Sequence, residues 1–145
     1  MVKIFRRLTR RTVTYLIIDT PIFSCLQWLY LSVVLGEETV RVLQDVEDNV
    51  QAGKINLLPV SLIGRRDIDV GADLFISTWG LSESSVYAQD YVIANNWFGA
   101  KHILLAYQDS CKELPQADRV GKLAENTGAV VEDIEFLPGH HYAFR

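Results

Sequence analysis

Short apolar runs alternate along this chain with segments in which apolar residues recur every three to four positions. The short runs are rich in β-branched residues and lack polar alternation, which is typical of strands buried on both faces. They cover residues 13–18, 55–60, 73–78 and 102–107. Helical periodicity covers residues 2–11, 22–35, 37–52, 84–98 and 115–127. This alternation predicts an α/β fold with a mostly parallel, doubly wound sheet.

The end of the chain predicts an antiparallel hairpin. Residues 130–137 and 140–145 both have strand-like sequences, and only Pro138 and Gly139 separate them. Proline followed by glycine favours a type II turn, because glycine accepts the positive φ at the third position of that turn. We therefore expect the sheet to finish with one antiparallel strand.

Composition and charge limit the class of protein. The chain has 145 residues, 49% hydrophobic and 22% charged, which is enough to bury the core of one domain. A net charge of −4 argues against a general nucleic-acid binder, which needs a basic surface. The charge is uneven, since the first 15 residues contain no acid and five bases: Lys3, Arg6, Arg7, Arg10 and Arg11.

The sequence favours a cytoplasmic protein. Two cysteines, Cys25 and Cys111, are too few for a disulfide framework or a four-ligand zinc site, and we interpret them as reduced thiols. Asp19 and Pro21 divide the apolar residues near the start, so neither half reaches the ~20 residues of a membrane helix. No small-residue cleavage site follows a short apolar stretch, and we expect no export or membrane association.

Candidate binding residues lie where the predicted strands end. Ligands of open α/β sheets bind outside the carboxyl ends of the strands. Those ends carry Asp19 and Thr20, Ser61, the segment 77–79, and Asp109. The sequence therefore predicts a ligand site at this edge.

The layout resembles the class I S-adenosylmethionine-dependent methyltransferases, and within them the sugar O-methyltransferases. The matching segments are YLIIDTP at 15–21, LQWLYL at 26–31, DLFISTWGLSE at 73–83 and HHYAFR at 140–145. The resemblance covers nearly the whole chain. It implies a single Rossmann-like methyltransferase domain over residues 1–145, mostly parallel, with a C-terminal antiparallel hairpin. It also implies S-adenosylmethionine as cofactor and a small-molecule acceptor, such as a sugar hydroxyl.

The resemblance assigns roles to particular residues. Asp19 matches the acidic residue that bonds the ribose hydroxyls of the cofactor, with Thr20 and Ser61 as further cofactor-binding residues. A carboxylate can accept two hydroxyl hydrogen bonds at once. An alternative is that Asp19 only caps the helix that begins near Pro21.

The predicted strand at 73–78 resembles the family's fourth strand, whose end lies beside the reactive methyl group. Ser77, Thr78 and Trp79 would then line cofactor and acceptor, and Glu83 would take the proton of the acceptor hydroxyl. An alternative is that Glu83 merely begins the next helix. His140 and His141 point to opposite faces of a strand, which favours structural roles over a shared site.

The sequence departs from the family at its start. The family binds its cofactor with a Gly-rich turn after a first strand, and this sequence contains no G-x-G-x-G segment. Residues 2–11 resemble the exit of the helix that follows that turn, so we expect a partial, N-terminally truncated domain. An upstream segment or a partner chain would supply the first strand.

Two other functions stay open. One is a non-catalytic binding or assembly protein built on a degenerate methyltransferase fold. The other is a nucleotide-binding α/β protein such as a short dehydrogenase, although no G-x-G-x-x-G opens a helix here.

Overall fold

The computed structural model describes residues 12–63 and 71–145, and it is α/β. The chain divides into two compact units, Met1–Ile68 and Asp69–Arg145, and each is described by itself. The helix predicted at 2–11 lies outside the described residues. The prediction of one domain over the whole chain stays a prediction.

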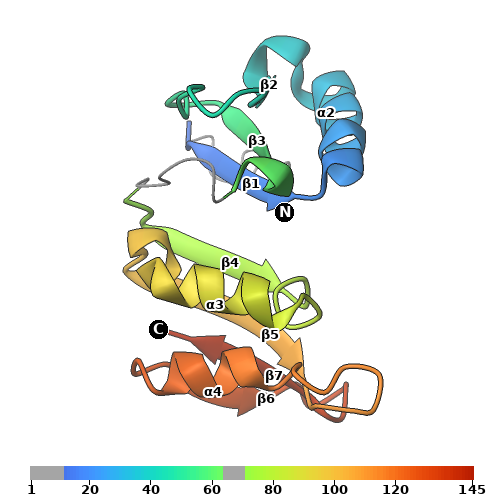
Figure 1. The fold of residues 1–145 in the computed structure, drawn as a ribbon, viewed down its shortest axis with the longest axis vertical. Helices are drawn as coiled ribbons and strands as arrows, with labels where there is room; N and C mark the ends of the chain where they lie inside the picture. Colours follow the sequence, from blue (N-terminus) through green and yellow to red (C-terminus); the bar gives the residue numbers. More distant parts are fainter. Residues whose placement is uncertain (1–11, 64–70) are drawn as a thin grey trace. The chain divides into compact units, whose positions relative to one another are not determined.

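The first unit has a parallel three-stranded sheet (Figure 1). Its strands are β1 (Tyr15–Asp19), β2 (Val40–Val42) and β3 (Ile55–Pro59), and β3 lies between the other two. Tyr15 is aligned with Ile55, and Val40 is aligned with Ile55 from the other side. Short 3₁₀ turns cover Glu37–Thr39 and Val60–Leu62. The predicted strands at 13–18 and 55–60 are confirmed as β1 and β3.

Helix α2 (Pro21–Leu35) connects β1 to the rest of this unit. Pro21 occupies its first turn, where a missing backbone N–H costs nothing, and Gly36 ends it with a φ of 94°. The predicted helix at 22–35 is therefore confirmed. Leu31 of α2 packs with Ile55 and Leu57 of β3 in the core of the unit.

The helix predicted at 37–52 is wrong. Its apparent helical period rests on Val40, Leu43, Val46 and Val50, but Val40 lies in β2, which pairs with β3, and the other three follow that strand in turns and irregular structure. Beyond β2 the chain turns around Asp48, whose carboxylate accepts the backbone N–H groups of Gln44 and Asp45 at 2.7 and 3.2 Å. These two hydrogen bonds replace helical ones, and β-branched valine favours the extended conformation.

A buried asparagine holds the end of this loop to the sheet. Asn56 accepts the backbone N–H of Gln51 at 2.9 Å and donates its side-chain amide to the carbonyls of Tyr15 and Gln51 at 3.1 and 3.0 Å. Its side chain is fully buried, so these bonds offset the cost of removing an amide from water.

The second unit has a mixed four-stranded sheet of β4 (Leu74–Thr78), β5 (His102–Gln108), β6 (Val130–Asp133) and β7 (His140–Phe144). The strand order is β4-β5-β7-β6. β4 and β5 are parallel, whereas β7 is antiparallel to both β5 and β6. Helices α3 (Val86–Ala94) and α4 (Arg119–Glu125) lie on the same face of this sheet (Figure 1).

The hairpin predicted at the end of the chain is confirmed. β6 and β7 are antiparallel, with Asp133 opposite His141. The N–H of His140 bonds the carbonyl of Leu137 at 3.1 Å, and Gly139 has a φ of 75°, as a type II turn requires. A longer segment, 134–139, connects the two strands.

The two helices of this unit are shorter than predicted. Ser85 caps α3 by accepting the N–H of Ala88 at 3.3 Å, and α3 ends at Ala94 rather than at 98. Residues 96–98 then have left-handed φ values, which begin at Asn96, a residue type that tolerates them. This turn buries Trp97, which packs with Ile103 and Leu105 in the core.

Candidate functional site

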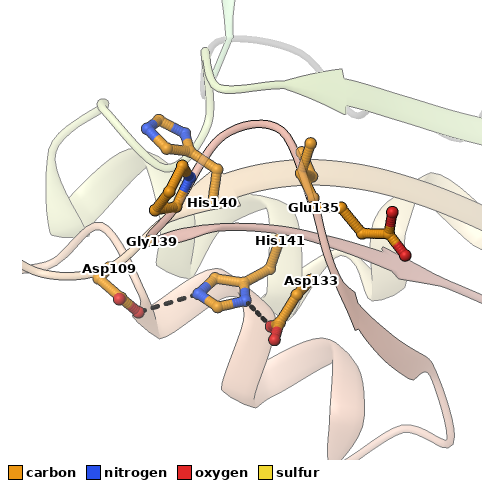
Figure 2. A pocket seen from close by; sticks show the side chains of 8 residues that line it. Asp109, Asp133, Glu135, Gly139, His140 and His141 are labelled. Atoms are coloured by element: carbon orange, nitrogen blue, oxygen red, sulfur yellow. Dashed lines mark hydrogen bonds and ion pairs between the residues drawn. The ribbon is translucent and has the colours of Figure 1, made fainter.

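A pocket of about 580 Å³ lies at the end of the second sheet where its parallel strands finish, which we call the binding edge. The parallel strands β4, β5 and β6 all end at this edge, and β7 begins there. The lining residues come from the end of β5, the end of β6, the connecting segment and the start of β7 (Figure 2). They are Asp109, Asp133, Ile134, Glu135, Pro138, Gly139, His140 and His141.

His141 is held between two carboxylates. Its Nδ1 lies 2.8 Å from Oδ1 of Asp133, and its Nε2 lies 3.0 Å from Oδ1 of Asp109 (Figure 2). Both ring nitrogens can donate to these oxygens only when the imidazole carries two protons. Partial burial opposes that charge, but the hydrogen bonds and charges of Asp109 and Asp133 outweigh it, so the pKa of His141 is raised above 6.5. We call this arrangement the Asp109–His141–Asp133 bridge.

The bridge connects segments that are distant in sequence. Asp109 follows β5, and its backbone N–H donates to the carbonyl of Gly139 at 2.8 Å. The ring of His141 also lies against that of Tyr107 on β5, with centroids 5.2 Å apart. Burial, followed by nearby carboxylates that begin with Glu125, raises the pKa of Tyr107 above 10.0, so its hydroxyl stays protonated at neutral pH.

His140 points away from the bridge and contacts the end of β4 (Figure 2). The indole N–H of Trp79 donates to Nδ1 of His140 at 2.8 Å. An imidazole that accepts at Nδ1 carries its proton at Nε2 when it is neutral. His140 can therefore donate a hydrogen bond through Nε2, while its basic nitrogen is occupied by Trp79.

These contacts divide the chemical roles at this edge. His141 has both ring nitrogens hydrogen-bonded to carboxylates, so neither nitrogen is free to act as a base in the pocket. His140 serves as a donor, and the carboxylates of Asp109 and Glu135 remain as acceptors for hydroxyl groups in the pocket. Such a mixture of acceptors and one donor suits a polyhydroxylated small molecule.

The predicted residues of the second unit lie at or near this edge. Ser77 accepts the N–H of Leu81 at 3.0 Å, so its hydroxyl oxygen stabilises the turn after β4. Thr78 is exposed, and Trp79 is half-buried with a φ of 62°. Glu83 is exposed, and its backbone N–H bonds the carbonyl of Trp79. Because Ser85 is the cap of α3, Glu83 precedes that helix and does not begin it.

The predicted residues of the first unit lie at or just after the carboxyl ends of β1 and β3. The two carboxylate oxygens of Asp19 accept the backbone N–H of Thr20 at 2.7 Å and the side-chain amide of Gln27 at 2.8 Å. Thr20 is the N-cap residue of α2, so Asp19 lies one residue before it and orients that end of the helix. Ser61 is exposed in the 3₁₀ turn after β3.

The Asp109–His141–Asp133 bridge is not predicted by the sequence pattern. Asp109 and the two histidines stand far apart in the sequence, and nothing around Asp133 marks it as a candidate. The signal that points to the bridge is the hairpin register, because a strand pair that aligns Asp133 with His141 puts both side chains on one face.

Two further properties of the described residues bear on the site. Over residues 12–63 and 71–145, no group of three or more histidine, cysteine or carboxylate side chains could hold a metal ion. Within the same ranges, no helix is both long and apolar enough to cross a membrane.

Comparisons with known proteins give no match. No protein-family model, no curated protein and no solved structure matches the chain.

Proposed function

We propose that this chain belongs to an enzyme that transfers the methyl group of S-adenosylmethionine to a hydroxyl of a sugar or a similar small molecule. One observation carries the proposal. The methyltransferase sheet places its first strand between its second and fourth strands, which correspond here to β1 and β4. Within the described residues, β1 and β4 are both edge strands, each paired on one side only. In the family, the first strand pairs with the second and the fourth strands on these two sides.

The arrangement of β7 supports the same interpretation. β7 is antiparallel to β5 and β6 and lies between them, so the sheet finishes with the antiparallel strand that the resemblance implies. We infer that a further segment of chain or a partner chain supplies the first strand of the family's sheet, together with the glycine-rich turn.

Asp19 fits the role of ribose ligand. Each of its oxygens accepts one hydrogen bond within the unit, and a carboxylate oxygen has a second lone pair for a ligand hydroxyl. The bonds from Thr20 and Gln27 also hold the carboxylate in one orientation. Bound S-adenosylmethionine would supply an activated methyl group on its sulfonium sulfur.

The acceptor chemistry then needs a base and a polar pocket. Glu83 would take the proton of the acceptor hydroxyl while the hydroxyl oxygen forms its bond to the methyl carbon. The bond between the methyl carbon and sulfur would break in the same step, with its electron pair remaining on sulfur. Asp109, Glu135 and His140 would bind the other hydroxyl groups of the acceptor.

The second candidate is a non-catalytic binding or assembly protein. The sequence given contains no glycine-rich turn, and Asp19 alone offers two ligand hydrogen bonds of about 1–3 kcal/mol each. Such contacts correspond to a dissociation constant of about 1 mM, which is too weak for efficient turnover. Binding without methyl transfer would favour this candidate.

The test is an NMR titration of the 145-residue protein with S-adenosylhomocysteine up to several millimolar. We expect shifts of the Thr20 and Gln27 amides that saturate near 1 mM and vanish in Asp19→Asn. Asp45→Asn is the matched control, since Asp45 also accepts the N–H of the next residue but lies outside the proposed site. No shift in the native protein would overturn the proposal. Transfer of a labelled methyl group to a sugar would favour the enzyme, whereas binding without transfer would favour the non-catalytic protein.

A further inference from the structure

Helix α2 has two apolar faces, and the sheet covers only one of them. The face toward the sheet carries Ser24, Trp28, Leu31 and Leu35, which are buried or half-buried. The other face carries six large apolar side chains that are 54–79% exposed: Ile22, Phe23, Leu26, Leu29, Tyr30 and Val33. An exposed apolar patch of this kind marks an interaction site.

The spacing of the exposed side chains identifies the shape of the partner. Ile22, Leu26, Leu29 and Val33 are four, three and four residues apart, which forms a straight apolar seam along a helix. This spacing fits the packing of a second helix along α2.

We propose that this seam binds the same seam of a second copy of the chain, so that two α2 helices pair in a homodimer. The inference is independent of the proposed methyl transfer. Phe23 and Tyr30 flank the seam, and an aromatic side chain buries roughly 150–250 Å² when it is fully covered, whereas an aliphatic side chain of the seam buries roughly 60–120 Å². From their exposed fractions the six side chains can bury roughly 300–600 Å² per copy, which corresponds to a small, reversible interface.

The charges favour an antiparallel pair. No residue of Pro21–Leu35 is charged, so nothing along the seam repels an identical helix. Glu37 and Glu38 follow the helix and are exposed. A parallel pair would bring Glu37 and Glu38 of both copies together. An antiparallel pair separates them and places them at the N-terminal end of the partner's helix, where the positive helix end offsets the single acid Asp19. The antiparallel register aligns Leu26 of each copy with Leu29 of the other.

Sedimentation analysis of the full chain tests the dimer. We expect a dimer at about 50 μM, and the double variant Leu26→Glu/Leu29→Glu should weaken its dissociation constant at least about 100-fold, since it places charges in a dry interface. Phe136→Glu, at another exposed apolar residue, is the matched control and should leave the dimer intact. Circular dichroism checks that each variant is folded. A native monomer, or a dimer that the double variant does not affect, would overturn the proposal.

Oxidative cross-linking tests the orientation. Cys25 and Cys111 are first replaced by serine, and Leu26→Cys and Leu29→Cys are then introduced into separate chains of different mass. The antiparallel pair predicts that a mixture forms mainly the mixed disulfide. Dominance of the two same-variant disulfides would show a parallel pair and overturn the antiparallel arrangement.

Discussion

Trp79 and His140 are 61 residues apart in sequence, yet the indole N–H of one donates to Nδ1 of the other at 2.8 Å. This bond connects the carboxyl end of β4 to the start of β7. Trp79 adopts a left-handed φ of 62° beside this bond, a conformation that costs a non-glycine residue on the order of 1 kcal/mol. The bond occupies Nδ1 of His140 as an acceptor, so the neutral ring carries its proton on Nε2.

The pKa of His141 gives the first prediction. Hydrogen bonds to Asp109 and Asp133 raise this pKa above 6.5 despite partial burial. A raised pKa in the folded state stabilises the fold fully below pH 6.5, and the contribution is lost as the pH rises through the folded-state pKa. Urea unfolding of the native protein should therefore show a free energy of unfolding that decreases as the pH rises from 6.5 through the folded-state pKa of His141.

Asp133→Asn separates the bridge from other titrations. It removes one of the two carboxylates, so the pKa of His141 measured by NMR should fall and the decrease in stability above pH 6.5 should become smaller. Glu132→Gln removes the same charge from the neighbouring residue, whose side chain points to the opposite face of β6. Equal effects of both variants would contradict a specific bridge.

The close contact between Gly121 and Tyr107 gives the second prediction. A Cβ atom at Gly121 would overlap Cζ of Tyr107, whose ring is buried and also contacts His141. Gly121→Ala should therefore lower the free energy of unfolding by about 1–3 kcal/mol, despite the better helix propensity of alanine. Urea denaturation measures this change.

Two further variants isolate the steric cause. Gly80→Ala is the control, because no atom lies within 4 Å of a Cβ there, and it should change stability by less than about 0.5 kcal/mol. Tyr107→Leu should make Gly121→Ala less costly than it is in the native background. If the two substitutions were simply additive, the contact would not be the cause.

Particular residues explain how far the sequence could predict the fold. Pro21 and Gly36 mark both ends of α2, and Pro138 with Gly139 marks the turn before β7, because each residue restricts or requires one backbone conformation. The segment at 37–52 was predicted wrongly, since the spacings of three and four residues among Val40, Leu43, Val46 and Val50 are compatible with a helix until the pairing of Val40 with β3 is known.

The site was less predictable than the fold. Strand ends identified Trp79 and Asp109 as candidates, because polar residues after a parallel strand lie at the binding edge. The Asp109–His141–Asp133 bridge depends on the register of β6 against β7, which the six-residue connection does not specify. The roles of Asp19 and Glu83 remain predictions.

Those two roles give the third prediction, which rests on the proposed function and concerns a protein complemented by the missing strand. Glu83→Gln should lower kcat about 100-fold with little change in the KM for S-adenosylmethionine, because a base acts only in the transition state. Asp19→Asn should mainly raise that KM, because ribose is bound equally before and during reaction. Steady-state kinetics measures both.

Glu125→Gln is the control for the carboxylate substitutions. Glu125 is exposed at the end of α4, at the opposite end of that helix from the binding edge, and its replacement should leave both constants unchanged. A normal kcat in Glu83→Gln would show that Glu83 is not the base. The proposed binding of the cofactor ribose by Asp19 would then depend on the Asp19→Asn result alone.

The open edge of β4 gives the last prediction. The N–H of Trp79 bonds the carbonyl of Ala106 on β5, so the alternate amides of β4, at Leu74, Ile76 and Thr78, point away from β5. No described strand pairs with that side, and the side chains of Leu74 and Ile76 are exposed. An apolar open edge recruits strands from other molecules. We therefore expect the chain alone to aggregate on heating. Leu74→Lys should raise the onset temperature of light scattering by several degrees, because charge opposes edge-to-edge pairing.

Val86→Lys adds the same charge at an exposed valine of α3 and should have little effect. Cooperative unfolding of the native chain without aggregation, or equal protection by both lysines, would show that this edge is not the cause.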